Sequence, residues 1–95
     1  MTLLEEVKLN LRISSVIFDE GEIEPLIEAC MADLKIAGVQ KWDDSDPLCK
    51  RAAVSYCKGH FGYDDKADRF INIYEHLKIA MSLSSDYNGG AENAE

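Results

Sequence analysis

The chain has few cations for its number of acids, few aromatic residues and no long apolar run. It carries 10 Lys and Arg residues against 18 Asp and Glu residues, which gives a net charge of −8. A chain of this sign is repelled by a phosphate backbone unless a local patch reverses it, so a free-standing DNA reader is not expected. No stretch of roughly 18 or more apolar residues occurs, so no membrane span is predicted.

Cysteine is also scarce. Cys30, Cys49 and Cys57 are odd in number and follow no paired spacing, which excludes a disulfide framework and is typical of a reducing compartment. The N-terminal residues M-T-L-L-E-E-V-K carry acids where a secretory signal carries cations. We therefore expect a mature, cytosolic chain.

Patterns that support catalysis or metal binding are incomplete. Cys57 and His60 lie one helical turn apart, but a metal site needs two further ligands, and the alternative is a buried thiol beside a half-exposed imidazole. As nucleophile and base, the pair lacks an orienting third group. Asp43, Asp44 and Asp46 resemble part of a calcium loop, but the glycine and the distal glutamate of such a loop are missing. The sequence predicts no enzyme activity, no metal and no cofactor.

What the sequence does contain is helical patterning, which is clearest from Asp46 to Gly62. Asp46 can cap a helix, Pro47 suits its first position, and Gly62 suits a left-handed C-terminal cap. Apolar side chains recur between them at helical spacing. The same helix is the only segment with a clear positive excess, given by Lys50, Arg51 and Lys58.

Three more helices are predicted to pack around this central one. The first runs from Thr2 to about Arg12 with a Thr2–Glu5 capping box. The second starts after an Asp19 cap, with Pro25 in its first turn, and ends at Gly38. Between these two helices, residues 13–18 are predicted to form a connector. The fourth helix follows a cap at Asp64 or Asp65 and runs to about Leu83.

The expected fold is all-α: a small four-helix domain with short connections, residues 1–84. The last segment, residues 85–95, has small polar residues and paired glycines that bury little surface. We predict that it is a flexible acidic tail, which gains order only against a partner.

Several local patterns, in this order, resemble one known family. They are L-L-E-E-V-K near the start, L-K-I-A-G-V at residues 34–39, D-P-L and then A-x-x-x-Y-x-K-x-x-F-G-Y-D at residues 52–64, R-F and Y-x-x-L-K in the fourth helix, and L-S-S-D-Y at residues 83–87. Together they resemble the head–tail connector proteins of phages and prophages, often called DNA-packaging proteins. The resemblance covers residues 1–87, and the end from Asn88 to Glu95 matches no pattern of that family.

This resemblance implies an all-α virion subunit at the head–tail junction, present in the host bacterial cytoplasm before assembly. It implies a homo-oligomeric ring, of portal-like symmetry, that binds the portal protein and a downstream connector, stopper or tail protein. DNA would pass through the channel without sequence-specific binding, and surplus acid suits such a wall because cations would hold the phosphates. No catalytic residues are implied.

The faces that form the subunit contacts remain open from sequence alone. Aromatic residues in or beside loops are candidates, because aromatics are enriched at interface centres, and sealing of the monomer's own core is the alternative. The cations of the central helix are candidates too, with salt pairs to acids of the second helix or of a neighbouring subunit. The predicted interface residues are Trp42, Lys50, Arg51, Lys58, Phe61, Tyr63 and Tyr87.

A second class of function fits the charge as well. A small acidic helical protein could bind and mask a basic nucleic-acid-binding partner, as a regulator does. The net charge of −8 and the acidic second helix motivate this alternative.

Overall fold

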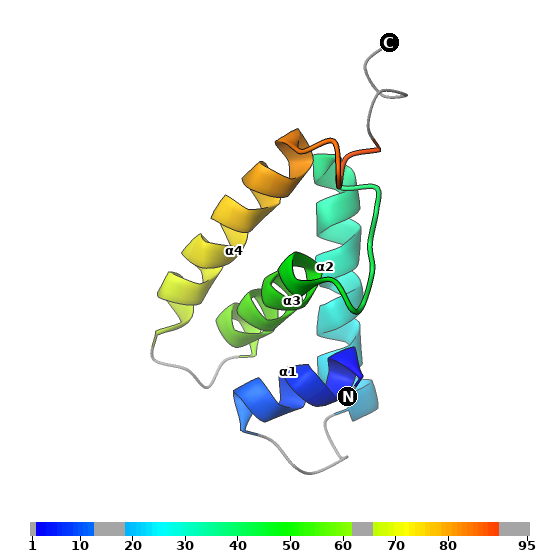
Figure 1. Cartoon of the computed structure of the whole chain (residues 1–95). Helices are drawn as coiled ribbons and strands as arrows, with labels where there is room; N and C mark the ends of the chain where they lie inside the picture. The colour runs from blue at the N-terminus through cyan, green and yellow to red at the C-terminus, as the bar shows by residue number, and fades with distance from the viewer. Residues whose placement is uncertain (1, 13–18, 62–65, 90–95) are drawn as a thin grey trace.

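The computed structural model of the chain describes residues 2–12, 19–61 and 66–89. Within these ranges all regular structure is helical (Figure 1), which confirms the all-α prediction of four helices with short connections. The elements in chain order are α1 (Leu3–Leu11), a π-helical turn (Asp19–Ile23), α2 (Glu24–Ala37), α3 (Pro47–His60) and α4 (Ala67–Leu83). No helix in the described part of the chain is long and apolar enough to cross a membrane.

Two predicted N-terminal caps are confirmed. At α1, the amide of Glu5 donates to Thr2 Oγ1 at 3.1 Å and the amide of Thr2 donates to Glu5 Oε1 at 2.7 Å, which completes the capping box. At α3, Asp46 Oδ2 accepts from the amides of Leu48 and Cys49 at 3.0 and 3.1 Å. These bonds satisfy amides that the helix itself leaves without partners.

The second helix ends as predicted but begins differently. Gly38 lies in the left-handed region at φ 109°, and its amide donates to the carbonyl of Lys35 at 3.1 Å. Asp19 is not a cap preceding the helix, because it already belongs to the π-helical turn. The physical reason is Pro25: it has no N–H to donate to the carbonyl four residues back, so the first turns cannot follow a regular α-helical ladder.

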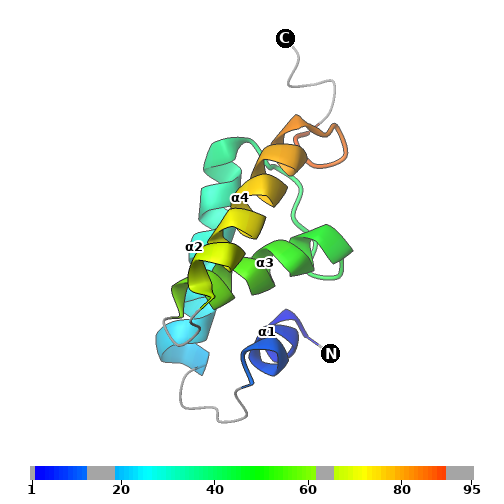
Figure 2. The same ribbon diagram turned by 90° about the vertical axis from the view of Figure 1, so that its left-hand side faces the viewer.

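The third helix is central, because it contacts each of the other three helices. In Figure 1, α2 runs behind α3, with α4 to the left and α1 below. Figure 2 shows α2 on the left and α3 on the right, and α4 contacts both. One buried cluster comprises Cys30, Leu34, Val39, Cys49, Ala52, Tyr74 and Met81. A second comprises Leu3, Val7, Ile23, Ile27, Ala53 and Cys57. Since both clusters include side chains of α3, this helix joins the two halves of the core.

The start of the predicted C-terminal tail is packed against the body. Tyr87 O accepts from the amides of Gln40 and Lys41 at 2.8 and 3.0 Å, and Tyr87 Oη donates to Asp46 Oδ2 at 3.0 Å. The Tyr87 ring also packs against the first core cluster. Tyr87, which falls in the segment 85–95 predicted as the tail, thus packs against the helical body. The Tyr87 ring contacts apolar side chains and its hydroxyl donates to the Asp46 carboxylate, and neither contact can be predicted from the composition of residues 85–95.

Several predictions fall outside the described residues. They are the connector at residues 13–18, the Gly62 cap, the cap at Asp64 or Asp65, and the remainder of the predicted tail, residues 90–95.

Candidate protein interface

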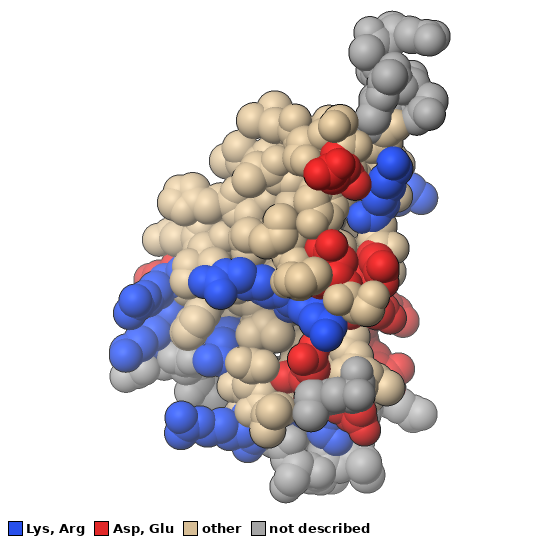
Figure 3. Space-filling model, viewed as in Figure 1, with Lys and Arg blue, Asp and Glu red and all other residues tan. Residues whose placement is uncertain are grey.

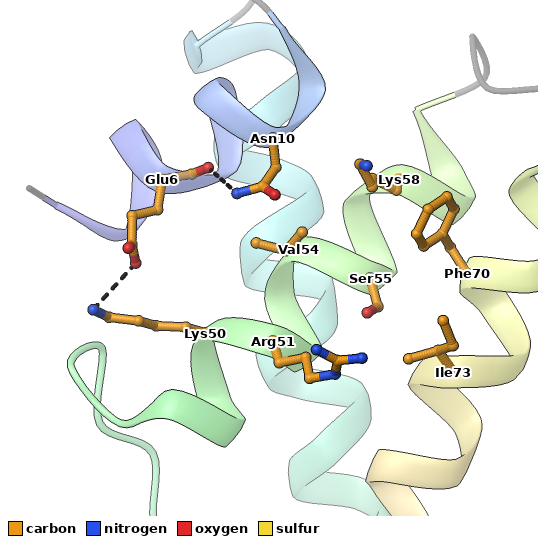
Figure 4. Close-up of a pocket in the computed structure, with 9 residues that line it drawn as sticks. All are labelled: Glu6, Asn10, Lys50, Arg51, Val54, Ser55, Lys58, Phe70 and Ile73. Carbon is orange, nitrogen blue, oxygen red and sulfur yellow. Dashed lines mark hydrogen bonds and ion pairs between the residues drawn. The ribbon is translucent and has the colours of Figure 1, made fainter.

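The three cations predicted on the central helix lie on one face of α3, together with Val54. Because Cys49, Ala53 and Cys57 are buried at four-residue spacing, positions 50, 51, 54 and 58 point away from that core face. There, α3 forms an open hollow of about 310 Å³ with α1 and α4 (Figure 4). We call this hollow the cradle, and its lining residues are Glu6, Asn10, Lys50, Arg51, Val54, Ser55, Lys58, Phe70 and Ile73.

Lys50 closes one edge of the cradle. Its Nζ lies 3.2 Å from Glu6 Oε2, and this ion pair joins α3 to α1. The amide of the Asn10 side chain donates to the carbonyl of Glu6 at 2.8 Å on the same edge. The structure thus corrects the expected pairing with acids of the second helix. The first helix crosses this face of α3, an approach that local periodicity does not reveal.

The other two cations, Lys58 and Arg51, take part in no ion pair found among the described residues. Lys58 Nζ lies 4.5 Å from the centre of the Phe70 ring, a cation–π contact between α3 and α4. Arg51 is exposed, and none of the ion pairs or hydrogen bonds found among the described residues involves its guanidinium. Figure 4 shows this group extending toward the gap between α3 and α4. Arg51 is therefore a cation held at the cradle without a partner in the described chain.

The aromatic candidates are placed differently. Trp42 is half-buried against both core clusters, and its indole N–H donates to the carboxylate of Asp44. Phe61 packs against the second cluster, and Tyr87 against the first. Tyr63 lies outside the described residues. The aromatic rings that the structure describes thus seal the subunit's own core, and their predicted interface role stays a prediction.

Cys57 and His60 differ in exposure. Cys57 is fully buried, and burial raises the pKa of its thiol to about 12. His60 is exposed, its ring stacks on Tyr56 at 4.1 Å, and its Nδ1 lies 2.8 Å from the Tyr56 carbonyl. One helical turn apart, the two residues form the alternative named from the sequence, a buried thiol and a more exposed imidazole. No group of three potential metal ligands occurs among the residues described.

A polar network lies between α2 and α4, away from the cradle. Tyr74 Oη donates to Asp33 Oδ2 at 2.6 Å, and Lys78 Nζ lies 3.1 Å from the same oxygen and 3.0 Å from Glu75 Oε1. The Tyr74 hydrogen bond, followed by Lys78, lowers the pKa of Asp33. Burial and the Asp33 carboxylate raise the pKa of Tyr74. Tyr74 and Lys78 both have carboxylate partners, so this network ties the two helices together.

Sequence reasoning did not single out the apolar part of the cradle. Val54 lies three residues after Arg51 and four before Lys58, so the helical wheel of the central helix carried a signal for it. Phe70 is half-buried, and like Ile73 it lines the cradle from α4. Their approach to α3 is tertiary and has no local signature.

The cradle face has an uneven charge. Figure 3 shows Lys and Arg side chains in a band across the middle and lower left of this face, and Asp and Glu side chains toward its right. A chain with a net charge of −8 thus presents a local cationic surface beside apolar side chains. Such a surface can bind a partner that offers carboxylates around an apolar strip.

Comparison with known proteins identifies a family for this chain. A family model described as phage connector protein matches residues 3–88, which is nearly the whole chain. The comparisons with curated proteins and with solved structures gave no match. The family is a structural one, its members are virion components, and it confirms the resemblance found in the sequence. This chain belongs to the phage connector protein family.

Proposed function

We propose that the protein is a head–tail connector subunit that assembles into a ring beneath the portal and extends the DNA channel toward the tail. The observation that carries this proposal is the family match over residues 3–88. A connector acts by shape and contact, and such a role requires no turnover of substrate.

The geometry of the subunit supports a ring. A ring is a closed set of contacts in which one surface of each subunit meets a different surface of the next. The cradle is one candidate surface, because it joins apolar side chains to an exposed cation, Arg51, without using that cation inside the described chain. A surface of this kind is better explained by a protein contact than by solvent exposure.

The charge balance supports passage of DNA through the ring. The net charge of −8 would give a wall that repels phosphates, whereas a cationic wall would bind them and slow transit. The proposed partners are therefore other copies of the chain, the portal protein on the head side, and a connector, stopper or tail protein on the other. The proposed location is the head–tail junction, after assembly from subunits in the host cytoplasm.

The proposal is tested by light scattering coupled to size-exclusion chromatography, with the purified chain alone and with the portal protein of the same phage. Negative-stain images of the largest species give its shape. We expect closed rings with an open centre, or rings formed on the portal. A chain that stays monomeric at every concentration and does not bind portal contradicts the proposal.

A further inference from the structure

We propose that the cradle binds the outer face of α2 from a second copy of the chain. The inference rests on the proposed ring and assigns the two surfaces that meet in it.

The outer face of α2 is apolar and exposed. We call it the outer stripe and define it as Pro25, Ala29, Ala32 and Ile36, which follow one another at helical spacing. All four are exposed, and Ile36 is 86% exposed although it is a large apolar side chain. The stripe lies opposite the buried face of α2, since Ile27, Cys30 and Leu34 are packed into the core. A helix that is apolar on its solvent side as well as its core side is typical of one with a second packing partner.

Acids without partners flank the outer stripe. Glu24 and Glu28 lie one turn apart, both are exposed, and neither takes part in an ion pair among the residues described. The cradle offers the opposite charge, because within the described ranges Arg51 has no partner and the contact found for Lys58 is with the Phe70 ring. Facing carboxylates and cations of this kind fix register and orientation at an interface.

The apolar parts also correspond. Val54, Phe70 and Ile73 line the cradle while remaining half exposed. They can cover the small side chains of the outer stripe, which let two helices approach closely. A contact with apolar residues at its centre and charges at its rim has the usual anatomy of a protein interface.

The two surfaces lie on opposite sides of the subunit. In Figures 1 and 2, α2 lies beyond α3 as seen from the cradle, and Figure 4 shows α2 behind α3 in the same way. A surface on one side that fits a surface on the other gives a head-to-tail contact, which is repeated by each added copy. Such contacts lead to a ring when the rotation closes.

The acidic loop before α3 fits the cradle less well. The carboxylate of Asp43 already accepts from the Ser45 amide at 2.9 Å, and that of Asp44 accepts from Trp42. Glu24 and Glu28 have no such bonds among the described residues, and unlike Asp43 and Asp44 they lie on the helix that carries the outer stripe. The charge and the apolar surface therefore favour α2 over the loop.

The test is a charge swap across the proposed contact, read by light scattering at a concentration where the wild type is assembled. Arg51→Glu alone, and Glu24→Lys with Glu28→Lys, should each weaken assembly by at least about tenfold, because like charges then face one another. The chain that carries all three changes should regain assembly. Lys41→Glu is the matched control, an equal charge change outside the cradle and α2, and circular dichroism checks that every variant is folded.

Two results would overturn the assignment. One is a folded Arg51→Glu chain that assembles like the wild type and the Lys41→Glu control. The other is rescue of Arg51→Glu by Asp43→Lys with Asp44→Lys and not by the α2 changes, which would place the loop in the cradle. Either result would leave the proposal of a ring standing and reject only the assigned contact. A wild type that never assembles contradicts the ring and the contact together.

Discussion

The two faces of α3 differ although they share one helix of 14 residues. The inner face is built from Cys49, Ala53 and Cys57, which are fully buried and small. The outer face carries Arg51 and Val54, which remain available at the cradle. The comparison indicates that the inner face determines stability, whereas the outer face is free to serve assembly.

The small side chains of the inner face have a structural consequence. They allow the other helices to pack close to α3. Burial also raises the pKa of the Cys30 and Cys57 thiols to about 12, so these groups stay protonated and unreactive near neutral pH. Cysteine here acts as a small apolar residue.

The largest effect is expected for a core leucine that packs beside the inner face. Leu34 is 1% exposed and shares a cluster with Cys49 and Ala52. Leu34→Ala should lower the free energy of unfolding by about 2–5 kcal/mol, because a cavity adds to the lost burial. Ile36→Ala on the same helix is the control and should change it by less than about 0.5 kcal/mol. Urea denaturation measures the free energy of unfolding of both variants. Equal losses would show that the buried and the outer faces do not differ in their contribution to stability.

The next effect concerns the end of the chain. Truncation after Ser84 removes Tyr87, its ring packing and its bonds to the loop and to the Asp46 cap of α3. We expect a loss of about 2–3 kcal/mol in unfolding free energy, from an aromatic contact and several hydrogen bonds. Truncation after Gly89 keeps all these contacts and is the control. An unchanged melting temperature in the shorter chain would show that Tyr87 does not support the fold.

A smaller effect is expected at the hydroxyl of Tyr74. Tyr74→Phe removes the 2.6 Å bond to Asp33 and should cost about 1.5 kcal/mol at pH 7, the low end for a charged acceptor, since Asp33 stays partly hydrated. The pKa of Asp33 is lowered in the folded chain. The ionised Asp33 carboxylate therefore contributes fully to stability above about pH 4, near the ordinary pKa of an aspartate. This contribution is lost as the pH falls through the lowered pKa of Asp33.

The wild type and Tyr74→Phe should thus differ less in their free energy of unfolding at acid pH than at neutral pH. Urea denaturation of both chains at about pH 7 and about pH 3 measures this. A difference that is equal or larger in acid would contradict the assigned role of the carboxylate.

A close approach between α3 and α4 at Gly59 predicts a still smaller loss of unfolding free energy. A Cβ added at Gly59 would lie 2.6 Å from Ile71 Cγ1 and 3.3 Å from the Ile71 amide nitrogen. Gly59→Ala should therefore destabilise the fold by about 1 kcal/mol, because the steric cost exceeds the gain in helix propensity. Thermal unfolding of Gly59→Ala, in the wild-type chain and in an Ile71→Ala chain that lacks Cγ1, measures the effect. The loss should be smaller in the Ile71→Ala chain, and a Gly59→Ala chain more stable than the wild type would show that the helices can separate without cost.

The smallest effect on stability is expected on the outer face. Arg51→Glu should change the free energy of unfolding by less than about 0.5 kcal/mol, because the guanidinium has no partner within the described ranges. Thermal unfolding at a concentration where the chain is monomeric measures this. A large loss would show that Arg51 belongs to the fold, and the outer face would lose its distinction from the inner one.

Much of the fold could be predicted because its signals are local. The caps at Thr2 and Asp46, the left-handed Gly38 and the apolar spacing of the helices depend on neighbours within four residues. The start of α2 was predicted less well, because the effect of Pro25 on the preceding turn competes with the cap expected from Asp19.

The site could be predicted only in part. The cations of α3 were visible in sequence, but the partner of Lys50 is Glu6 on α1, which depends on how the helices cross. The anchoring of Tyr87 to Asp46 likewise joins positions 41 residues apart. Contacts of this kind arise from tertiary packing, which cannot be predicted from local sequence patterns.

The most direct test of the account uses a mixture of two variants, Arg51→Glu and the chain with Glu24→Lys and Glu28→Lys. Each variant keeps one unaltered surface, so the cradle of one can still bind the α2 face of the other. The altered cradle and the altered α2 face also carry opposite charges, so the two variants can alternate around a ring. Native mass spectrometry should show monomers of each variant alone, and closed assemblies that contain the two variants in equal numbers in the mixture. Monomers only in the mixture, or assembly of either variant alone, would contradict a head-to-tail contact between the cradle and α2.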